Sequence, residues 1–196
     1  MLSNTSKMPG KSISLSAEKC ITGSKLAKIK DTVCEDCYAL KGAYRYPVVK
    51  KKMGERMGFF NASNFIPAMV MELNRTKSDY FRWFDSGDIQ SMRMLPNIVK
   101  IAVAVPTTTF WLPTKENKMV ASYLKKHGAF PNNLIVRVSA PMIDGQPPKR
   151  FELTSTVHKN EAPIDHECNA HNQDNKCMDC RACWNPSIKN ISYKYH

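Results

Sequence analysis

Two groups of cysteines, one near each end, constrain this chain more than any other feature of its sequence. The N-terminal cysteine group consists of Cys20, Cys34 and Cys37, and the C-terminal cysteine group of Cys168, Cys177, Cys180 and Cys183. No cysteine stands between residues 38 and 167. We therefore expect two thiol-rich, metal-binding segments and, between them, an α/β scaffold that presents a site to them.

The C-terminal cysteine group has the spacing of an iron–sulfur ligand run. Cys177, Cys180 and Cys183 follow one another as C-x2-C-x2-C, a run that iron–sulfur clusters use. Structural zinc sites more often combine one C-x2-C pair with a second pair further along the chain. Cys168 is the candidate for a fourth ligand. This group therefore favours a [4Fe-4S] cluster.

The N-terminal cysteine group supplies only three thiols. Its spacing is C-x13-C-x2-C, from Cys20 to Cys37. Three thiolates would leave one iron of a four-iron cluster open to a substrate or cofactor, unless another residue supplies the fourth ligand. The sequence thus predicts one or two [4Fe-4S] clusters.

The thiols have two alternative uses. Structural zinc at one or both groups stays open, with His166 and His171 as further ligands. Disulfides suit a secreted chain, but the first residues contain no apolar core of a signal peptide. Disulfides are also rare in the cytosol, and seven cysteines is an odd number. Iron–sulfur binding is therefore the leading hypothesis.

The chain's length and composition fit one domain, or one domain with a small metal-bound extension. It has 196 residues, of which 42% are hydrophobic, and this is enough for a core. No apolar run reaches the roughly 18 residues of a membrane-spanning helix, so we expect no membrane partner. The net charge of +12 suggests a polyanion or a phosphorylated partner, although excess lysine often only solubilises a surface.

The middle of the chain alternates between strand and helix patterns. We predict strands over residues 11–16, 80–84, 108–112, 134–138 and 151–157, and helices over residues 48–60, 67–75, 89–101 and 115–127. This alternation with short loops is typical of a parallel sheet. Because an eight-fold barrel needs about 250 residues, a partial parallel β/α barrel, half to three-quarters complete, fits better.

The predicted division of the chain follows from this pattern. Residues 1–157 form the partial α/β barrel, with the N-terminal cysteine loop at residues 20–37. Residues 158–196 carry no clear secondary-structure pattern and are interpreted as a cysteine-rich, metal-organised extension.

Polar residues follow three of the predicted strands. Residues 85–88, Asp-Ser-Gly-Asp, follow the strand over 80–84 and include Ser86, Gly87 and Asp88. Residues 114–116 follow the next strand, and Arg137 and Ser139 end the third. The carboxyl ends of parallel strands meet at one edge, so these side chains should lie near the N-terminal cysteine loop. Their ordinary alternatives are helix caps and surface residues.

An aromatic and basic stretch precedes the first long helix. Tyr44 and Tyr46 flank Arg45 and could stack on a base, and residues 50–52 are three lysines. The alternative is that the tyrosines pack beneath the cysteine loop. This stretch is the candidate nucleic-acid interface.

Two short motifs resemble the radical S-adenosylmethionine superfamily. They are Cys34-Glu-Asp-Cys37-Tyr38-Ala39 and the turn Ser86-Gly87-Asp88. The resemblance implies that Cys20, Cys34 and Cys37 hold a cluster with one open iron, and that the turn contacts the amino group of S-adenosylmethionine. It further implies that Arg137 and Ser139 are candidate cofactor contacts and that the C-terminal cysteines hold an auxiliary cluster.

A second resemblance covers nearly the whole chain. The segments that carry it include Phe81 to Asp88, Trp111 to Glu116, Arg137 to Ala140 and Cys180 to Trp184. They look like a bacteriophage family known as gene product 88-like, which implies a viral protein made in the host bacterial cytoplasm. Two function hypotheses result. The first is an iron–sulfur protein with a radical-type site of unknown substrate, and the second is a non-catalytic iron–sulfur or zinc protein that binds nucleic acid or a host protein.

Overall fold

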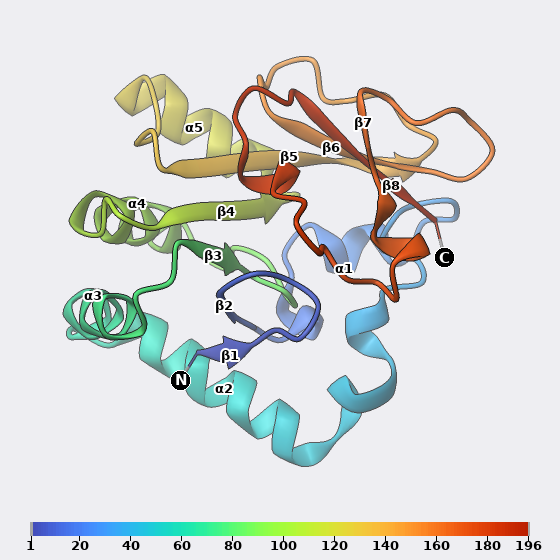
Figure 1. The fold of residues 1–196 in the computed structure, drawn as a ribbon. Coiled ribbons are helices and arrows are strands. Elements are labelled where there is room, and N and C mark those ends of the chain that lie inside the picture. Colours follow the sequence, from blue (N-terminus) through green and yellow to red (C-terminus); the bar gives the residue numbers. More distant parts are fainter. Residues whose placement is uncertain (1, 196) are drawn as a thin grey trace.

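An open eight-stranded sheet, parallel except at one edge, forms the centre of the molecule (Figure 1). The computed structural model describes residues 2–195. Within them the strands are β1 (Ser3–Asn4), β2 (Lys11–Ile13), β3 (Tyr80–Trp83), β4 (Thr109–Thr114), β5 (Leu134–Ile143), β6 (Thr154–His158), β7 (His166–Cys168) and β8 (Asn190–Lys194).

Helices connect the first strands and line the cysteine segments. The α-helices are α1 (Gly23–Leu26), α2 (Pro47–Asn61), α3 (Phe65–Thr76), α4 (Met94–Ala104) and α5 (Asn117–His127). The short 3-10 helices are η1 (Ala17–Lys19), η2 (Tyr38–Leu40), η3 (Gly42–Arg45), η4 (Asn169–Asn172) and η5 (Ala182–Trp184).

The strand order confirms the predicted α/β class. Strands β2 to β6 pair in sequence order and in parallel, with α2 and α3, α4 and α5 as the first three crossovers. Strand β1 adds an antiparallel edge, and β8 and then β7 extend the other side. The sheet is not closed, and its description as half to three-quarters of a barrel stays a prediction.

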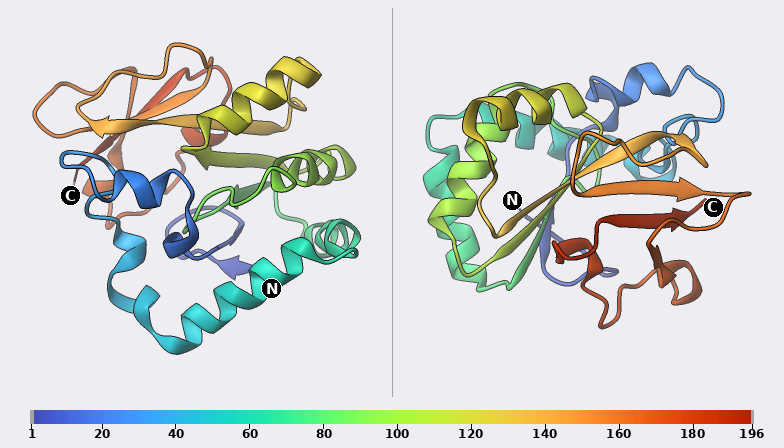
Figure 2. Two further views of the ribbon diagram at one scale, coloured as in Figure 1. Left: turned by 180° about the vertical axis from the view of Figure 1, so that it is seen from behind. Right: turned by 90° about the horizontal axis from the view of Figure 1, so that it is seen from above.

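The two faces of the sheet are covered by different parts of the chain. Alternate residues of β3 and β4, such as Phe81, Trp83 and Phe110, join the large apolar core beneath α3, α4 and α5. The intervening residues, such as Tyr80 and Trp111, contact the C-terminal segment instead. Figure 2 shows these helices on one side of the sheet and the C-terminal segment on the other.

The sequence explains the helix boundaries well. In α3, Phe65, Met69 and Leu73 recur every four residues and are buried as one stripe. Helix α5 ends at His127, and the next residue, Gly128, has a φ of 80° that favours glycine. Helix α4 begins at Met94, later than predicted, which places Pro96 in its first turn, where proline costs no hydrogen bond.

One prediction was wrong. Residues 158–196 contain two strands, β7 and β8, and these lie in the same sheet as the predicted barrel strands. Both strands are short, and β8 reads Asn-Ile-Ser-Tyr-Lys, with polar and apolar residues mixed, so pattern alone does not reveal them. They form because β6 offers a parallel edge. The proposed domain division at residue 157 stays a prediction.

Candidate metal centres

The N-terminal cysteine group lies beyond the carboxyl ends of β2 to β4, close to α1 (Figure 1). A Cβ atom placed on Gly23 would lie 3.0 Å from the Cys20 Cβ, 3.6 Å from the Cys34 Sγ and 3.7 Å from the Cys20 Sγ. Two of the three thiols therefore converge on one glycine, and any larger side chain there would crowd the pair. Cys34 is buried, whereas Cys20 and Cys37 are half-buried.

The three thiols share one electrostatic environment. Burial raises the pKa of Cys20 to about 12, and Asp88, Cys37 and Cys34 add to the rise. Lys115 acts in the opposite direction on the Cys20 pKa. Ligation would require these thiols to lose their protons, so metal binding would release protons at neutral pH.

A buried carboxylate fastens the cysteine loop to the start of α5. The Thr22 N–H donates to one Glu116 oxygen at 2.7 Å, and the Thr22 hydroxyl donates to the other at 2.8 Å. Glu116 is buried, so these two hydrogen bonds satisfy a carboxylate that would otherwise be costly. Further along the loop, Val33 N–H donates to the Pro141 carbonyl at 3.0 Å, which ties the loop to β5.

The structure brings Asp88 to this rim, as the strand pattern predicts. Its carboxylate accepts hydrogen bonds from the Ile89 N–H at 2.7 Å, the Thr114 hydroxyl at 2.6 Å and the Lys115 N–H at 2.8 Å. Burial raises the Asp88 pKa to about 6, and those hydrogen bonds oppose the rise. Asp88 thus joins the ends of β3 and β4 beside the N-terminal cysteine group.

Ser86 and Gly87 connect the end of β3 to the end of β2. The Ser86 hydroxyl donates to the Leu15 carbonyl at 3.0 Å, and the Leu15 N–H donates to the Ser86 carbonyl at 2.8 Å. Gly87 has a φ of 81°, and a Cβ there would lie 2.7 Å from the Leu15 carbonyl oxygen. The turn therefore requires glycine for packing. Ser139 accepts a hydrogen bond from Ser155 at 2.9 Å. The cofactor roles predicted for these residues stay predictions.

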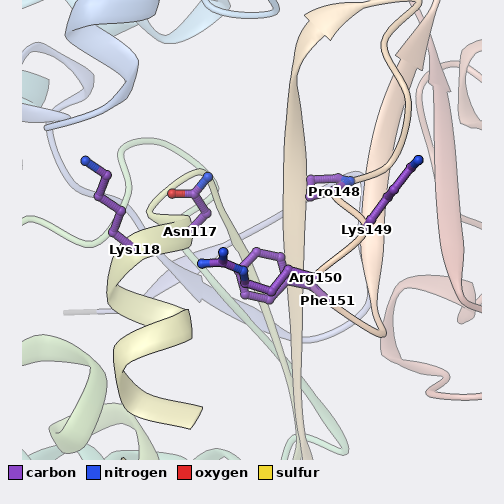
Figure 3. A pocket seen from close by; sticks show the side chains of 6 residues that line it. All are labelled: Asn117, Lys118, Pro148, Lys149, Arg150 and Phe151. Atoms are coloured by element: carbon purple, nitrogen blue, oxygen red, sulfur yellow. The ribbon is translucent and has the colours of Figure 1, made fainter. Parts of the chain in front are cut away.

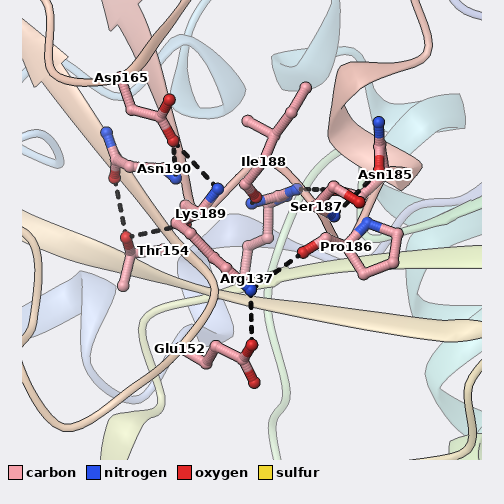
Figure 4. A network of polar contacts seen from close by, with 10 residues as sticks. All are labelled: Arg137, Glu152, Thr154, Asp165, Asn185, Pro186, Ser187, Ile188, Lys189 and Asn190. Carbon is pink, nitrogen blue, oxygen red and sulfur yellow. Dashed lines mark hydrogen bonds and ion pairs between the residues drawn. The ribbon is translucent and has the colours of Figure 1, made fainter.

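Arg137 lies under the C-terminal segment and is fully buried, with 0% of its surface exposed. Its guanidinium donates to four backbone carbonyls at 2.8 to 3.2 Å, those of Cys183, Ile188, Ala182 and Asn185. Figure 4 shows the segment from Asn185 to Asn190 arranged around this side chain. Arg137 therefore shapes the chain that carries Cys183, and four of its five N–H groups are already used.

The four C-terminal thiols also gather at one place. Burial raises the pKa of Cys183 to about 12, and Cys168 and Cys177 contribute to the rise. Cys180 acts on both Cys168 and Cys177 in the same direction. The Cys180 Sγ lies 3.9 Å from the His166 Nε2, so one histidine lies beside this group.

Aromatic packing holds this second group against the sheet. The Trp184 indole N–H donates to the Phe81 carbonyl at 3.0 Å, and its ring meets Trp111 edge-on at 5.2 Å. The Cys177 N–H donates to the Lys7 carbonyl at 2.8 Å. Three residues of the loop, Asp174, Asn175 and Met178, have positive φ, as expected where a short loop turns tightly around a site.

Arg82 lies near Tyr38 and the C-terminal cysteine group. Its Nε is buried without a hydrogen-bond acceptor, and its guanidinium stands 4.5 Å over the Trp111 ring. Burial lowers the pKa of Arg82. Nearby groups outweigh that effect and raise the pKa overall, and they are Tyr38, Tyr193, Asp85 and Cys183. The sequence places this charged residue in an otherwise apolar strand, Tyr-Phe-Arg-Trp, but no role for Arg82 was predicted from it.

The cysteines are free thiols, so the structure gives no support to the disulfide alternative. Across residues 2–195, no three His, Cys, Asp or Glu side chains converge tightly enough to hold a single metal ion. The thiols of each group share an environment without forming one coordination sphere.

The candidate nucleic-acid interface is only partly free. Lys50 forms an ion pair with Glu18 at 2.6 Å, and Tyr44 packs edge-on against Tyr38 at 5.9 Å between ring centres. Tyr46 remains 61% exposed. The alternative, that the tyrosines pack beneath the cysteine loop, therefore fits Tyr44 better than Tyr46.

Fold and site together define an α/β protein with an open, mostly parallel sheet and two groups of cysteines. A family model described as Gene product 88 matches residues 3–192, and the chain belongs to that bacteriophage family. No curated protein and no solved structure matches the chain. The radical S-adenosylmethionine resemblance has no counterpart in these comparisons. No helix within residues 2–195 is long and apolar enough to cross a membrane.

Proposed function

We propose that this chain binds iron–sulfur clusters, with a [4Fe-4S] cluster at the C-terminal cysteine group and a second at the N-terminal group. The observation that supports the proposal is that the seven cysteines fall into two groups, three and four, and that the thiols within each group act on one another's pKa. Each thiolate of a four-iron cluster binds a different iron, so its ligands need not converge on one point.

The cations around Cys183 support an anionic centre there. Arg137 is buried and Arg82 has a buried Nε without an acceptor, and no ion pair joins either to a carboxylate within residues 2–195. A buried guanidinium is costly unless negative charge lies near it, and only Asp85 for Arg82 and Asp165 for Arg137 supply carboxylate charge among the groups that raise their pKa values. Thiolates bound to iron would supply negative charge beside both cations, whereas neutral thiols would not.

Zinc is the competing ligand at the C-terminal group. Cys180 and His166 lie close together, and zinc accepts mixed cysteine and histidine sets. An experiment therefore has to distinguish bound iron from bound zinc.

The test is a metal and sulfide analysis of protein purified without oxygen, with its absorption spectrum. About eight irons and eight sulfides per chain is the expected result for two clusters, and about four of each would mean one. A colourless protein with zinc and no sulfide would contradict the proposal and leave a zinc-stapled binding protein.

The N-terminal group supports a second candidate, a radical S-adenosylmethionine-like site of unknown substrate. Three thiols would leave one iron open, and Asp88 lies close enough to influence Cys20 and Cys34. A carboxylate beside an open iron can hold the amino group of such a cofactor.

This candidate is tested by adding S-adenosylmethionine to reduced, cluster-loaded protein and recording the electron paramagnetic resonance spectrum. The expected result is a changed cluster signal, followed by cleavage of the sulfonium. Asp88→Asn should weaken cofactor binding, whereas Asp79→Asn, the same substitution at the exposed residue before β3, should not. An unchanged spectrum with wild-type protein would contradict this candidate.

Free thiols and the bacteriophage family fit action in the host bacterial cytoplasm, a reducing compartment, and that location is part of the proposal. A binding function toward nucleic acid through residues 50–52 remains the alternative to catalysis. Its test is a titration with single-stranded DNA at two salt concentrations, since phosphate contacts weaken steeply with salt.

A further inference from the structure

A pocket of about 290 Å³ opens between the start of α5 and the loop before β6 (Figure 3). No cysteine lines it. The lining residues are Asn117, Lys118, Pro148, Lys149, Arg150 and Phe151. The volume lies at the lower end of the range for small-molecule sites, so the pocket suits one small ligand or one unit of a polymer.

Cationic residues border the pocket, although most of the surface that lines it is apolar. Three of its six lining residues, Lys118, Lys149 and Arg150, carry positive charge, and no carboxylate lines it. Among residues 2–195, none of these three cations takes part in an ion pair. Figure 3 shows the Lys118 and Lys149 amines directed outward on opposite sides, so these two charges lie at the rim of the pocket.

The acidic residues next to the pocket are already engaged. Glu116 precedes Asn117 and holds Thr22 through two hydrogen bonds. Glu152 follows Phe151 and forms an ion pair with Lys189 at 2.6 Å. Neither carboxylate neutralises the cations that border the pocket. This local excess of positive charge has the same sign as the net charge of the chain, +12.

The remaining lining residues narrow the ligand class. Arg150 offers a planar pair of donors that fits a phosphate, and the Asn117 side chain adds an amide donor. Phe151 is half-buried against the core and presents an aromatic wall to the same space. Phosphate-binding donors beside an aromatic ring are the pair of features that nucleotides use.

We propose that this pocket binds the phosphate of a nucleotide, either free or as one unit of a single strand. The site is separate from the cysteine groups and from residues 50–52, and the inference does not depend on cluster binding. The ligand would contact Asn117, which follows Glu116 in the chain. Glu116 is the residue that holds the N-terminal cysteine loop.

The test measures binding of three probes to the intact protein: inorganic phosphate, adenosine monophosphate and a fluorescein-labelled oligothymidine of twelve units. The key variant is Lys149→Ala with Arg150→Ala, both exposed. The matched control is Lys125→Ala with Lys126→Ala, which removes the same amount of charge from the last turn of α5. Circular dichroism confirms that each variant is folded.

The expected result is binding of at least one probe, weakened tenfold or more by the pocket variant and less than twofold by the control. For the oligonucleotide, each lost phosphate contact should also reduce the salt slope by about 0.7. Phe151→Leu should weaken adenosine monophosphate about tenfold and leave inorganic phosphate unchanged. If Phe151→Leu affects neither, the ligand is a phosphate without a stacked base.

Two results would overturn the inference. One is the absence of binding for all three probes up to about 1 mM. The other is equal weakening by the pocket and control variants, which would show a diffuse charge effect.

Discussion

The two cysteine groups use the same ligand type but are held in opposite ways. The N-terminal group is fastened by an anion, Glu116, which accepts both hydrogen bonds from Thr22. The C-terminal group is fastened by a cation, Arg137, which donates to four carbonyls, and by the buried ring of Trp184. The N-terminal group is held by hydrogen bonds between its loop and the start of α5, and the C-terminal group is held by contacts with the face of the sheet.

The difference also sets the charge around each group. Asp88 and Lys115 stand beside the N-terminal thiols, whereas Arg82 and Arg137 stand beside Cys183. A closed anionic centre is better matched by two guanidiniums, and an open site by one acid and one base. If both groups bind clusters as proposed, the C-terminal one would be the structural centre and the N-terminal one the ligand-facing centre.

The largest expected effect comes from Arg137→Met. The change leaves four carbonyls without their shared donor, and we expect it to lower the free energy of unfolding by about 3–5 kcal/mol. Limited proteolysis with mass spectrometry should show the first cleavage within residues 158–196. The N-terminal group should retain its metal.

Arg150→Met is the matched control, because it makes the same change at an exposed arginine. It should alter the unfolding free energy by no more than about 0.5 kcal/mol. If Arg137→Met unfolds at the same denaturant concentration as the unmodified chain, the role assigned to Arg137 is wrong.

An intermediate effect is expected from Glu116→Gln. The amide turns a donor toward Thr22 in place of one acceptor, which should cost about 1–3 kcal/mol locally. Hydrogen exchange at the Thr22 amide should accelerate, and Cys20 should react faster with a thiol reagent, while Cys183 should not change.

Glu152→Gln provides the reference for this change, since its ion pair with Lys189 is exposed and contributes little. Equal acceleration of Cys20 and Cys183 by Glu116→Gln would show that the two groups are not held independently.

The sequence predicted the scaffold better than the sites. Four helices and five strands were predicted close to where they lie, because buried stripes such as Phe65, Met69 and Leu73 leave a periodic signal. The gathering of the cysteines into two sites agrees with their spacing. The residues that hold the two cysteine groups in place were not predicted. Arg137 was predicted as a cofactor contact, but its four acceptors lie about 45 to 51 residues away in the chain, and no local pattern encodes them. Trp184 and Lys7 likewise act through distant backbone groups.

The smallest effect on stability should come from Asp144→Asn. This residue lies in the turn after β5, which contacts both the N-terminal cysteine loop and the residues after β6. The Ile143 N–H donates to the Asp31 carbonyl in the N-terminal cysteine loop, and the Asp144 carboxylate accepts the N–H groups of Lys159 and Asn160 just after β6. The hydrogen bond from Lys159 is the main cause of a lowered Asp144 pKa.

A lowered folded-state pKa means that the carboxylate stabilises the fold above its unfolded pKa of about 3.9, and that this is lost as pH falls through the folded value. The melting temperature of Asp144→Asn should therefore lie slightly below that of the unmodified chain from pH 5 to 7. The gap should close below pH 3.8. A gap that does not change with pH would show that the carboxylate charge is not involved.

The central claim is that the chain carries two separate iron–sulfur centres. It is tested most directly by counting iron and sulfide, without oxygen, in two variants that replace one cysteine group at a time with alanine. The account predicts that replacing Cys20, Cys34 and Cys37 leaves about four irons on the C-terminal group, and that replacing Cys168, Cys177, Cys180 and Cys183 leaves an oxygen-sensitive cluster on the N-terminal group. Loss of all iron from both folded variants, or iron content unchanged in either, would contradict it.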